Sequence, residues 1–317
     1  MKKLPLLFVF STLFFACINN TNKENTPLLS NTYSDIVYLL STTPHFGYND
    51  STFEEIEILL FDSILKNKSL LSSNPIDKYN FIDSAIYSFN FEDYSHIIIN
   101  DRENLFIQEN QLRFLYYYLT KQIKNILSDT TLHNLLNQEK NNIDSLLSSQ
   151  YSFIENHKGN YGTYSFVQYY NASIDLFSVL NEMQKDFYFT LIDSSYDSKT
   201  FQQIPSNHFI EAYKEIEKEI PNPNRIDDNL YNENDDYKAF INMQTNWNNL
   251  YNIRSLITNK LSGKIKQTYI NGTYQLQRYQ LIQLKHKFYG LVHAGTYMLT
   301  DSSSYEEIYT YKTDDLL

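Results

Sequence analysis

The chain has 317 residues, and 37 acidic against 26 basic side chains give it a formal net charge of −11. Nucleic-acid-binding proteins neutralise phosphates with Lys and Arg, so this charge argues against a nucleic-acid partner. It is compatible with a basic protein partner, although acidity can also serve solubility alone. The single Cys excludes intramolecular disulfides and cysteine-based metal sites.

Turn-forming residues are scarce in this sequence. It has 7 Gly and 7 Pro, and neither occurs between Ile76 and Lys158. An all-β protein needs turn residues about every 8–12 positions, and most of this chain offers none. The abundant Tyr and Phe would favour strands, but the missing turn residues outweigh that preference. We therefore expect an all-α fold of antiparallel helical hairpins that form bundle-like units.

The first 16 residues have the pattern of a secretory signal. Lys2 and Lys3 precede an apolar run, residues 4–16, which is too short to span a hydrocarbon core of about 30 Å. Leu13 to Cys17 resembles a lipobox, in which a signal peptidase cuts before a lipid-modified Cys. The alternative is an ordinary signal that happens to contain a Cys. We favour lipid attachment at Cys17, because the only Cys of the chain lies at the expected cleavage point.

Residues 17–32 are polar after the Cys and too poor in apolar side chains to fold, so they indicate a flexible tether. A lipid anchor with a tether predicts a protein attached to a membrane of the cell envelope and not embedded in it. Ile18 stands where some bacteria read an Asp as an inner-membrane retention signal. We therefore expect the outer membrane, on its periplasmic or its surface side.

Helical spacing recurs along the rest of the chain. Apolar periodicity and end signals predict helices over residues 51–64, 101–127, 131–156, 164–192, 205–220, 235–261 and 265–292. Loops are expected at 73–75 and 194–206. The run Ile97-Ile98-Ile99 could form a short extended piece.

The helix expected over 235–261 has the clearest apolar seam, with steps that alternate between three and four residues. Gly263 marks a short turn to the next helix, so the two should form an antiparallel hairpin. The expected seam of that next helix includes Ile270, Tyr274, Leu281, Leu284 and Phe288. The first seam consists of Phe240, Met243, Trp247, Leu250, Arg254, Ile257 and Leu261.

Arg254 interrupts the first seam, and Gln150 occupies the equivalent place in an earlier helix. If Arg254 is buried, it needs an acid or backbone carbonyls as partners. The alternative is a seam edge, where the stem of Arg254 covers apolar surface and its head stays in water. We favour the second interpretation.

A shift of 104 residues superposes the helices expected over 131–192 on those expected over 235–292 without a gap. Gly159 then meets Gly263, and the apolar positions fall in phase. The alternative is that any two helical hairpins of similar length can be phased together. We interpret the match as a duplication. The expected parts are an N-terminal helical region, residues 33–100, two helical units, residues 101–200 and 205–300, and a C-terminal tail, residues 301–317.

The second unit contains a Gln three residues before a Trp, a Tyr four residues after it, and Arg-x-x-Leu-x-x-Leu on the following helix. This pattern resembles the LprI-like lysozyme-inhibitor family of small helical, secreted or lipid-anchored bacterial domains. The Cys pair usual in that family is absent, and the first unit lacks the Trp. Trp247 lies on the apolar seam, so we expect it to pack in the core. The matching residues, which we expect to be mainly structural, are Gln244, Trp247, Tyr251, Arg278, Leu281 and Leu284.

Motifs for catalysis or metal binding are missing from the sequence. There is no His-Glu-x-x-His, no Gly-rich phosphate loop and no Gly-x-Ser-x-Gly. Asp93 and His96 have the spacing of a di-iron ligand pair, but only once. His208 and Glu211 lie one turn apart, as surface residues often do, and His286 and His293 are best read as one helix face. We therefore expect no cofactor and no metal site.

These observations favour a non-enzymatic binding module. The acidity and the family resemblance together make a basic, lysozyme-like protein one candidate partner. The alternative is a structural or assembly lipoprotein of an envelope complex, which binds through an aromatic-rich face. An envelope hydrolase ranks last, since spacing alone identifies no working pair of carboxylates.

Overall fold

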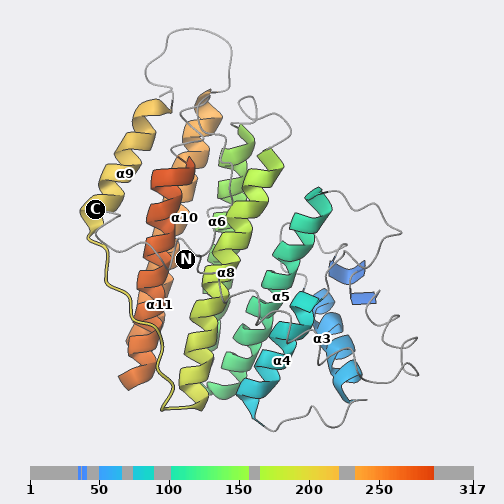
Figure 1. Ribbon diagram of the computed structural model, residues 1–317. Helices are drawn as coiled ribbons and strands as arrows, with labels where there is room; N and C mark the ends of the chain where they lie inside the picture. Colours follow the sequence, from blue (N-terminus) through green and yellow to red (C-terminus); the bar gives the residue numbers. More distant parts are fainter. Residues whose placement is uncertain are drawn as a thin grey trace, which may run out of the picture.

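The computed structural model describes residues 35–36, 38–40, 50–65, 74–88, 101–156, 165–220 and 233–288. Within them the regular elements are helices, with no strand, as the sequence predicts (Figure 1). The elements are α3 (Asp50–Leu65), α4 (Pro75–Ser88), α5 (Asp101–Ile126), α6 (Thr130–Asn156), α8 (Ser165–Ile192), α9 (Ser206–Glu219), α10 (Glu233–Lys260), α11 (Gly263–Ile282) and the π-helical segment η4 (Gln283–Phe288).

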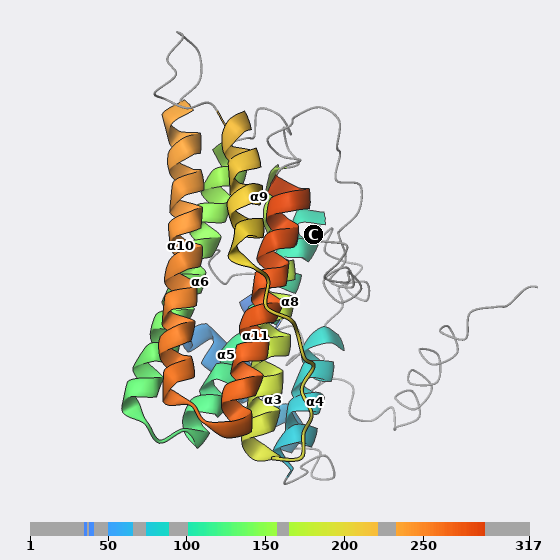
Figure 2. The ribbon, with the colours of Figure 1, turned by 90° about the vertical axis from the view of Figure 1, so that its left-hand side faces the viewer.

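Helices α6 and α10 run antiparallel. Two contacts show this, and they lie fourteen residues apart on each helix. Glu139 pairs with Arg254, and Phe153 packs on Phe240 with ring centroids 6.0 Å apart. Helices α8 and α11 are antiparallel as well, because Phe187 contacts Tyr269 while Tyr279 bonds to the carbonyl of Ala172. These four helices form the central bundle (Figures 1 and 2).

Helix α5 lies beside α8 and separates the bundle from α3 and α4 (Figure 1). Every residue from Glu109 to Thr120 is buried, so this segment has no face turned to water. Two of its side-chain amides bond to backbone carbonyls of the N-terminal helical segments. Asn110 donates to the carbonyl of Leu40 at 2.8 Å, and Gln111 donates to that of Ile86 at 2.9 Å. A helix that is covered all round in this way joins two hydrophobic cores.

The first core occupies the bundle and includes Phe177, Phe240, Trp247 and Tyr279. The second lies between α3, α4, α5 and the ends of α6, α8 and α10, and includes Phe53, Phe114, Phe189 and Ile257. Both cores contain residues from the ranges 101–200 and 205–300. The division into two units and the duplication stay predictions. Helix α6 pairs antiparallel with α10, and α8 pairs antiparallel with α11. Two copies of one hairpin related by a two-fold axis would make the same two pairs.

The helix predictions are confirmed for the described residues, within the two residues by which helix ends usually vary. Helix α4 was not predicted. It begins at Pro75, the last residue of the loop expected at 73–75. In α11 the seam is rotated from the expected one. Ile270 and Tyr274 are only partly buried, while Tyr269, Leu276 and Tyr279 face the core. The run 97–99, Gly159 and the C-terminal tail lie outside the described residues.

The expectation that Arg254 keeps its head in water is wrong. Its side chain is 2% exposed and forms an ion pair with Glu139. Nη2 donates to the carbonyl of Tyr269 at 3.2 Å, and Nε donates to Thr273 Oγ1 at 2.9 Å. Tyr269 closes the network by donating to the second oxygen of Glu139 at 3.0 Å. The acid comes from α6, so the spacing within α10 could not reveal it.

The seam of α10 is otherwise confirmed, because all its remaining positions are buried. Gly263 has a φ of 57°, in the left-handed region that favours glycine, which fits the predicted turn between α10 and α11. None of the helices in the described part of the chain has the length and apolar character needed to cross a membrane.

Candidate binding site

A groove with a volume of about 580 Å³ lies among α9, α10 and α11. In Figure 2, α9 lies between the other two helices. The volume falls within the range of about 300–1,000 Å³ that is usual for small-molecule sites. The lining residues are Gln203, Ile204, Ser206, Phe209, Ile210, Tyr213, Lys214, Glu217, Gln244, Asn248, Tyr251, Gln277 and Gln280.

Local helical spacing explains how these side chains meet. On α9, Phe209, Tyr213 and Glu217 follow one another at four-residue steps and therefore share one face. On α10, Gln244, Asn248 and Tyr251 form a similar row. Pro205 precedes the first residue of α9, as the sequence predicts, and so fixes where this wall of the groove begins.

Two buried aromatic residues hold the groove tyrosines in place. The ring of Tyr251 stacks on Trp247, with centroids 5.8 Å apart and planes 22° apart. The ring of Tyr213 meets Phe240 edge to face at 5.7 Å. Because both supporting rings are fully buried core residues, each tyrosine is positioned by the packed bundle and not by a loop.

Gln280 connects the two tyrosines across the groove. Tyr251 Oη donates to Gln280 Oε1 at 2.8 Å, and Gln280 Nε2 donates to Tyr213 Oη at 2.7 Å. One tyrosine therefore gives its proton to the amide oxygen, and the other accepts from the amide nitrogen. If the amide is turned over, the two tyrosines exchange roles. In either orientation one tyrosine O–H remains as a donor that this chain of bonds does not use.

One of the lining residues carries an unpaired acceptor. Gln277 Oε1 is buried and has no hydrogen-bond partner among the residues that the structure describes. Buried polar atoms normally have a partner, so this oxygen gains one if the Gln277 side chain turns into the groove and meets a ligand or a water. The residues that line the groove thus include one spare tyrosine donor and one unpaired acceptor.

The groove carries little charge. Lys214 and Glu217 have opposite charges and are both exposed on α9. Burial raises the pKa of Tyr213, and it raises that of Tyr251 well above its ordinary value. Both tyrosines are therefore neutral at physiological pH, and the site recognises its ligand through neutral hydrogen bonds.

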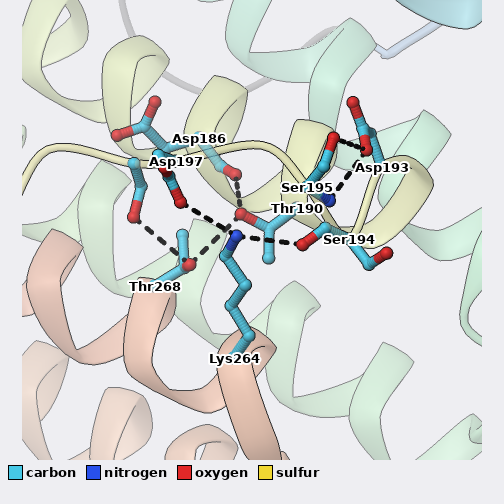
Figure 3. Close-up of polar contacts among 9 residues, drawn as sticks. Asp186, Thr190, Asp193, Ser194, Ser195, Asp197, Lys264 and Thr268 are labelled. Atoms are coloured by element: carbon cyan, nitrogen blue, oxygen red, sulfur yellow. Dashed lines mark hydrogen bonds and ion pairs between the residues drawn. The ribbon is translucent and has the colours of Figure 1, made fainter.

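The connection from α8 to α9, residues 193–205, runs beside α11 (Figures 1 and 2) and places α9 on the bundle. As Figure 3 shows, Lys264 at the start of α11 holds this connection. Its Nζ donates to the carbonyl of Ser194 at 2.9 Å and pairs with Asp197 at 3.1 Å. Thr268 bonds to both Thr190 and Ser198, at 3.1 and 3.3 Å. This cluster thus holds in place the connection that leads into α9, one wall of the groove.

The residues that matched the LprI-like pattern separate into two groups. Gln244 and Tyr251 line the groove. Trp247 is 1% exposed, which confirms that it packs in the core, and Arg278, Leu281 and Leu284 are buried as well. Cys17 lies outside the described residues, so its lipid attachment stays a prediction. The structure therefore brings two of the six motif residues to one surface.

Tyr213, Gln277 and Gln280 were not singled out from the sequence. Gln277 immediately precedes the Arg-x-x-Leu-x-x-Leu motif and Gln280 is one of its unspecified positions, and only the packing of α9 on α11 shows that both line a groove. Of the pair predicted to lie on the surface, Glu211 is exposed and His208 is half-buried on α9. Within the described ranges, no three His, Cys, Asp or Glu residues gather as a metal site would require.

Comparisons with known protein families, curated proteins and solved structures found no match to this chain. The resemblance to the LprI-like family therefore stays a prediction, carried only by the residues named above.

Proposed function

We propose that this protein is a membrane-anchored, non-enzymatic binding module of the cell envelope and that the groove among α9, α10 and α11 is its binding site. The observation that carries the proposal is a preformed groove whose lining residues include a tyrosine O–H that Gln280 leaves unused and an unpaired acceptor on Gln277. Pockets with a few fixed polar groups between packed helices are common ligand sites.

Binding is favoured over catalysis by the charges of the lining. General acid–base chemistry needs titrating groups in reach of the substrate, and glycoside hydrolysis usually needs two carboxyl groups. Glu217 is the one carboxylate among the described lining residues, and it is exposed.

A basic, lysozyme-like protein is the partner that the family resemblance suggests. Two features support it: the net charge of −11, and the presence of the motif residues Gln244 and Tyr251 in the groove. The groove itself carries little net charge, so the attraction of a basic partner comes from the acidic body around it, which speeds and strengthens association at low salt.

The alternative is a structural or assembly lipoprotein. Such a role calls for a large exposed apolar patch. The exposed large apolar residues in the described part are Tyr38, Ile58, Ile126, Ile210 and Leu256, and each comes from a different helical segment. This distribution gives the assembly role less support than the groove gives a binding role.

The test of the lysozyme partner is a cell-wall lysis assay with the full chain at low and at physiological salt. We expect dose-dependent loss of lysis that weakens with salt. Asn248→Trp should fill the groove and reduce the effect at least about tenfold, equal to about 1.4 kcal/mol. Asn242→Trp, on an exposed face of α10 outside the groove, is the matched control.

The outcomes separate the parts of the proposal. No effect at micromolar protein would remove lysozyme as the partner. Inhibition that survives Asn248→Trp would show that the groove is not the site of action.

A further inference from the structure

The groove lining has a composition that suits one class of ligand. Five of its residues are amides: Gln203, Gln244, Asn248, Gln277 and Gln280. Each amide has a donor and an acceptor side by side in one plane, although that of Gln280 already bonds to the two tyrosines. Neighbouring hydroxyl groups on a sugar ring are also donors and acceptors at once, so an amide can bond to two of them together.

The ring-bearing residues add the second element of sugar recognition. Phe209, Tyr213 and Tyr251 line the same groove. Aromatic rings offer flat apolar surface beside their polar tips, and the C–H faces of a sugar ring pack on such surface. Tyr213 and Tyr251 also bring hydroxyl groups, so apolar and polar contacts alternate over short distances.

The charge and the size of the groove narrow the choice of ligand further. The two charged lining residues, Lys214 and Glu217, have opposite signs, which favours a ligand without net charge. The groove volume of about 580 Å³ lies in the usual range of small-molecule sites, which suits a short ligand.

From these features we propose that the groove binds a short neutral oligosaccharide. A sugar hydroxyl accepts the tyrosine proton that Gln280 leaves unused, and a hydroxyl or an N-acetyl amide donates to Gln277 Oε1 once that side chain turns into the groove. This inference rests on the proposed function in so far as both assign binding to the same groove, but it does not depend on lysozyme as a partner.

The experiment is a titration by isothermal calorimetry and saturation-transfer NMR. The full chain is purified in a polyoxyethylene detergent, because sugar-based detergents would compete for the groove. The probes are the trimer of N-acetylglucosamine, maltotriose and, as the competing chemistry, a neutral alanine tripeptide. Each is measured at low and at high salt.

We expect at least one trisaccharide to bind, with an affinity that salt does not change. Tyr213→Phe and Gln277→Ala should each weaken binding about 3–10-fold, the effect of one neutral hydrogen bond. Tyr274→Phe and Gln267→Ala are the matched controls, since both lie on α11 outside the groove lining, and they should bind as the parent does.

Three results would overturn the inference: no trisaccharide binding at millimolar concentration, trisaccharide binding that the two groove variants leave unchanged, or binding of the tripeptide alone. Saccharide binding without any effect on lysozyme would keep this inference and remove that partner. Groove-dependent inhibition of lysozyme without saccharide binding would do the reverse.

Discussion

Arg254 on α10 and Glu139 on α6 are 115 residues apart in the chain and form an ion pair in which the side chains are 2% and 1% exposed. The ring of Tyr269 lies against the guanidinium, whose central carbon is 4.1 Å from the ring centroid. Every charged oxygen of Glu139 and each nitrogen of Arg254 has a partner. The pair therefore ties α6, α10 and α11 together at one point.

Removal of one partner of this pair should destabilise the fold strongly. We expect Arg254→Met or Glu139→Leu to lower the free energy of unfolding by about 3–5 kcal/mol, because each leaves a buried charge unpaired. The double variant should lose clearly less than the sum of the two. Urea denaturation followed by circular dichroism measures all three.

The control for that cycle is the exposed pair Lys218–Glu215 on α9, with side chains 63% and 54% exposed. Its double-variant cycle should show a coupling of about 0.5 kcal/mol or less. Additive losses at Arg254 and Glu139 would show that the two charges are not coupled in the folded protein.

Gly272 allows α11 to approach this network closely. A Cβ added there would lie 3.3 Å from Arg254 Nη2 and 3.3 Å from Met183 Cγ. Alanine raises helix propensity by about 1 kcal/mol over glycine, but overpacking costs about 1–3 kcal/mol, and Arg254 is held by its bonds. We expect Gly272→Ala to lower the free energy of unfolding by about 1 kcal/mol in chemical denaturation.

The same substitution in the Arg254→Met background provides its own check. Methionine is more adaptable than the bonded guanidinium, so the penalty of Gly272→Ala should shrink there. An equal penalty in both backgrounds would place the clash at Met183 instead.

Stability should fall as pH rises above the ordinary pKa values of Asp and Glu side chains. Burial raises the pKa of Glu109, against the opposing effects of Arg113 and Ser173, and burial likewise raises the pKa values of Asp83 and Asp186. Between its ordinary and its raised pKa, each group binds more proton in the folded than in the unfolded state. The free energy of unfolding therefore decreases with pH in that window.

Two other groups act in the opposite sense at lower pH. Hydrogen bonds from Ser195 lower the pKa of Asp193, and backbone bonds from Thr131 and Leu132 lower that of Asp129. Their contribution is lost only as pH falls below about 4. Denaturation at pH 5 and pH 7 isolates the first effect, and Glu109→Gln should reduce the difference. A difference unchanged in Glu109→Gln would exclude Glu109 as its source.

Lipid attachment at Cys17 predicts a specific chemical change. Cells that express the chain with labelled palmitate should yield a labelled protein in the membrane fraction, and Cys17→Ser should abolish the label. Ile18→Asp should move the labelled protein to the inner membrane where an Asp is read as a retention signal. Label that persists in Cys17→Ser would contradict the lipoprotein prediction.

The sequence by itself determined the helical class and most helix positions of the described chain, because scarce Gly and Pro and a 3.6-residue periodicity are local properties. It also placed Trp247 correctly in the core, since that residue lies in phase with the seam of α10. It did not reveal α4 or the rotated face of α11.

Tertiary structure decided what local periodicity cannot express. Arg254 is buried because an acid from α6 meets it, and the partner lies far away in sequence. The groove exists because the connection 193–205 lays α9 against α10 and α11, which turns Tyr213, Gln277 and Gln280 toward one space. Contacts between distant segments set both features, so their physical cause is the packing of helices and not the pattern along any one of them.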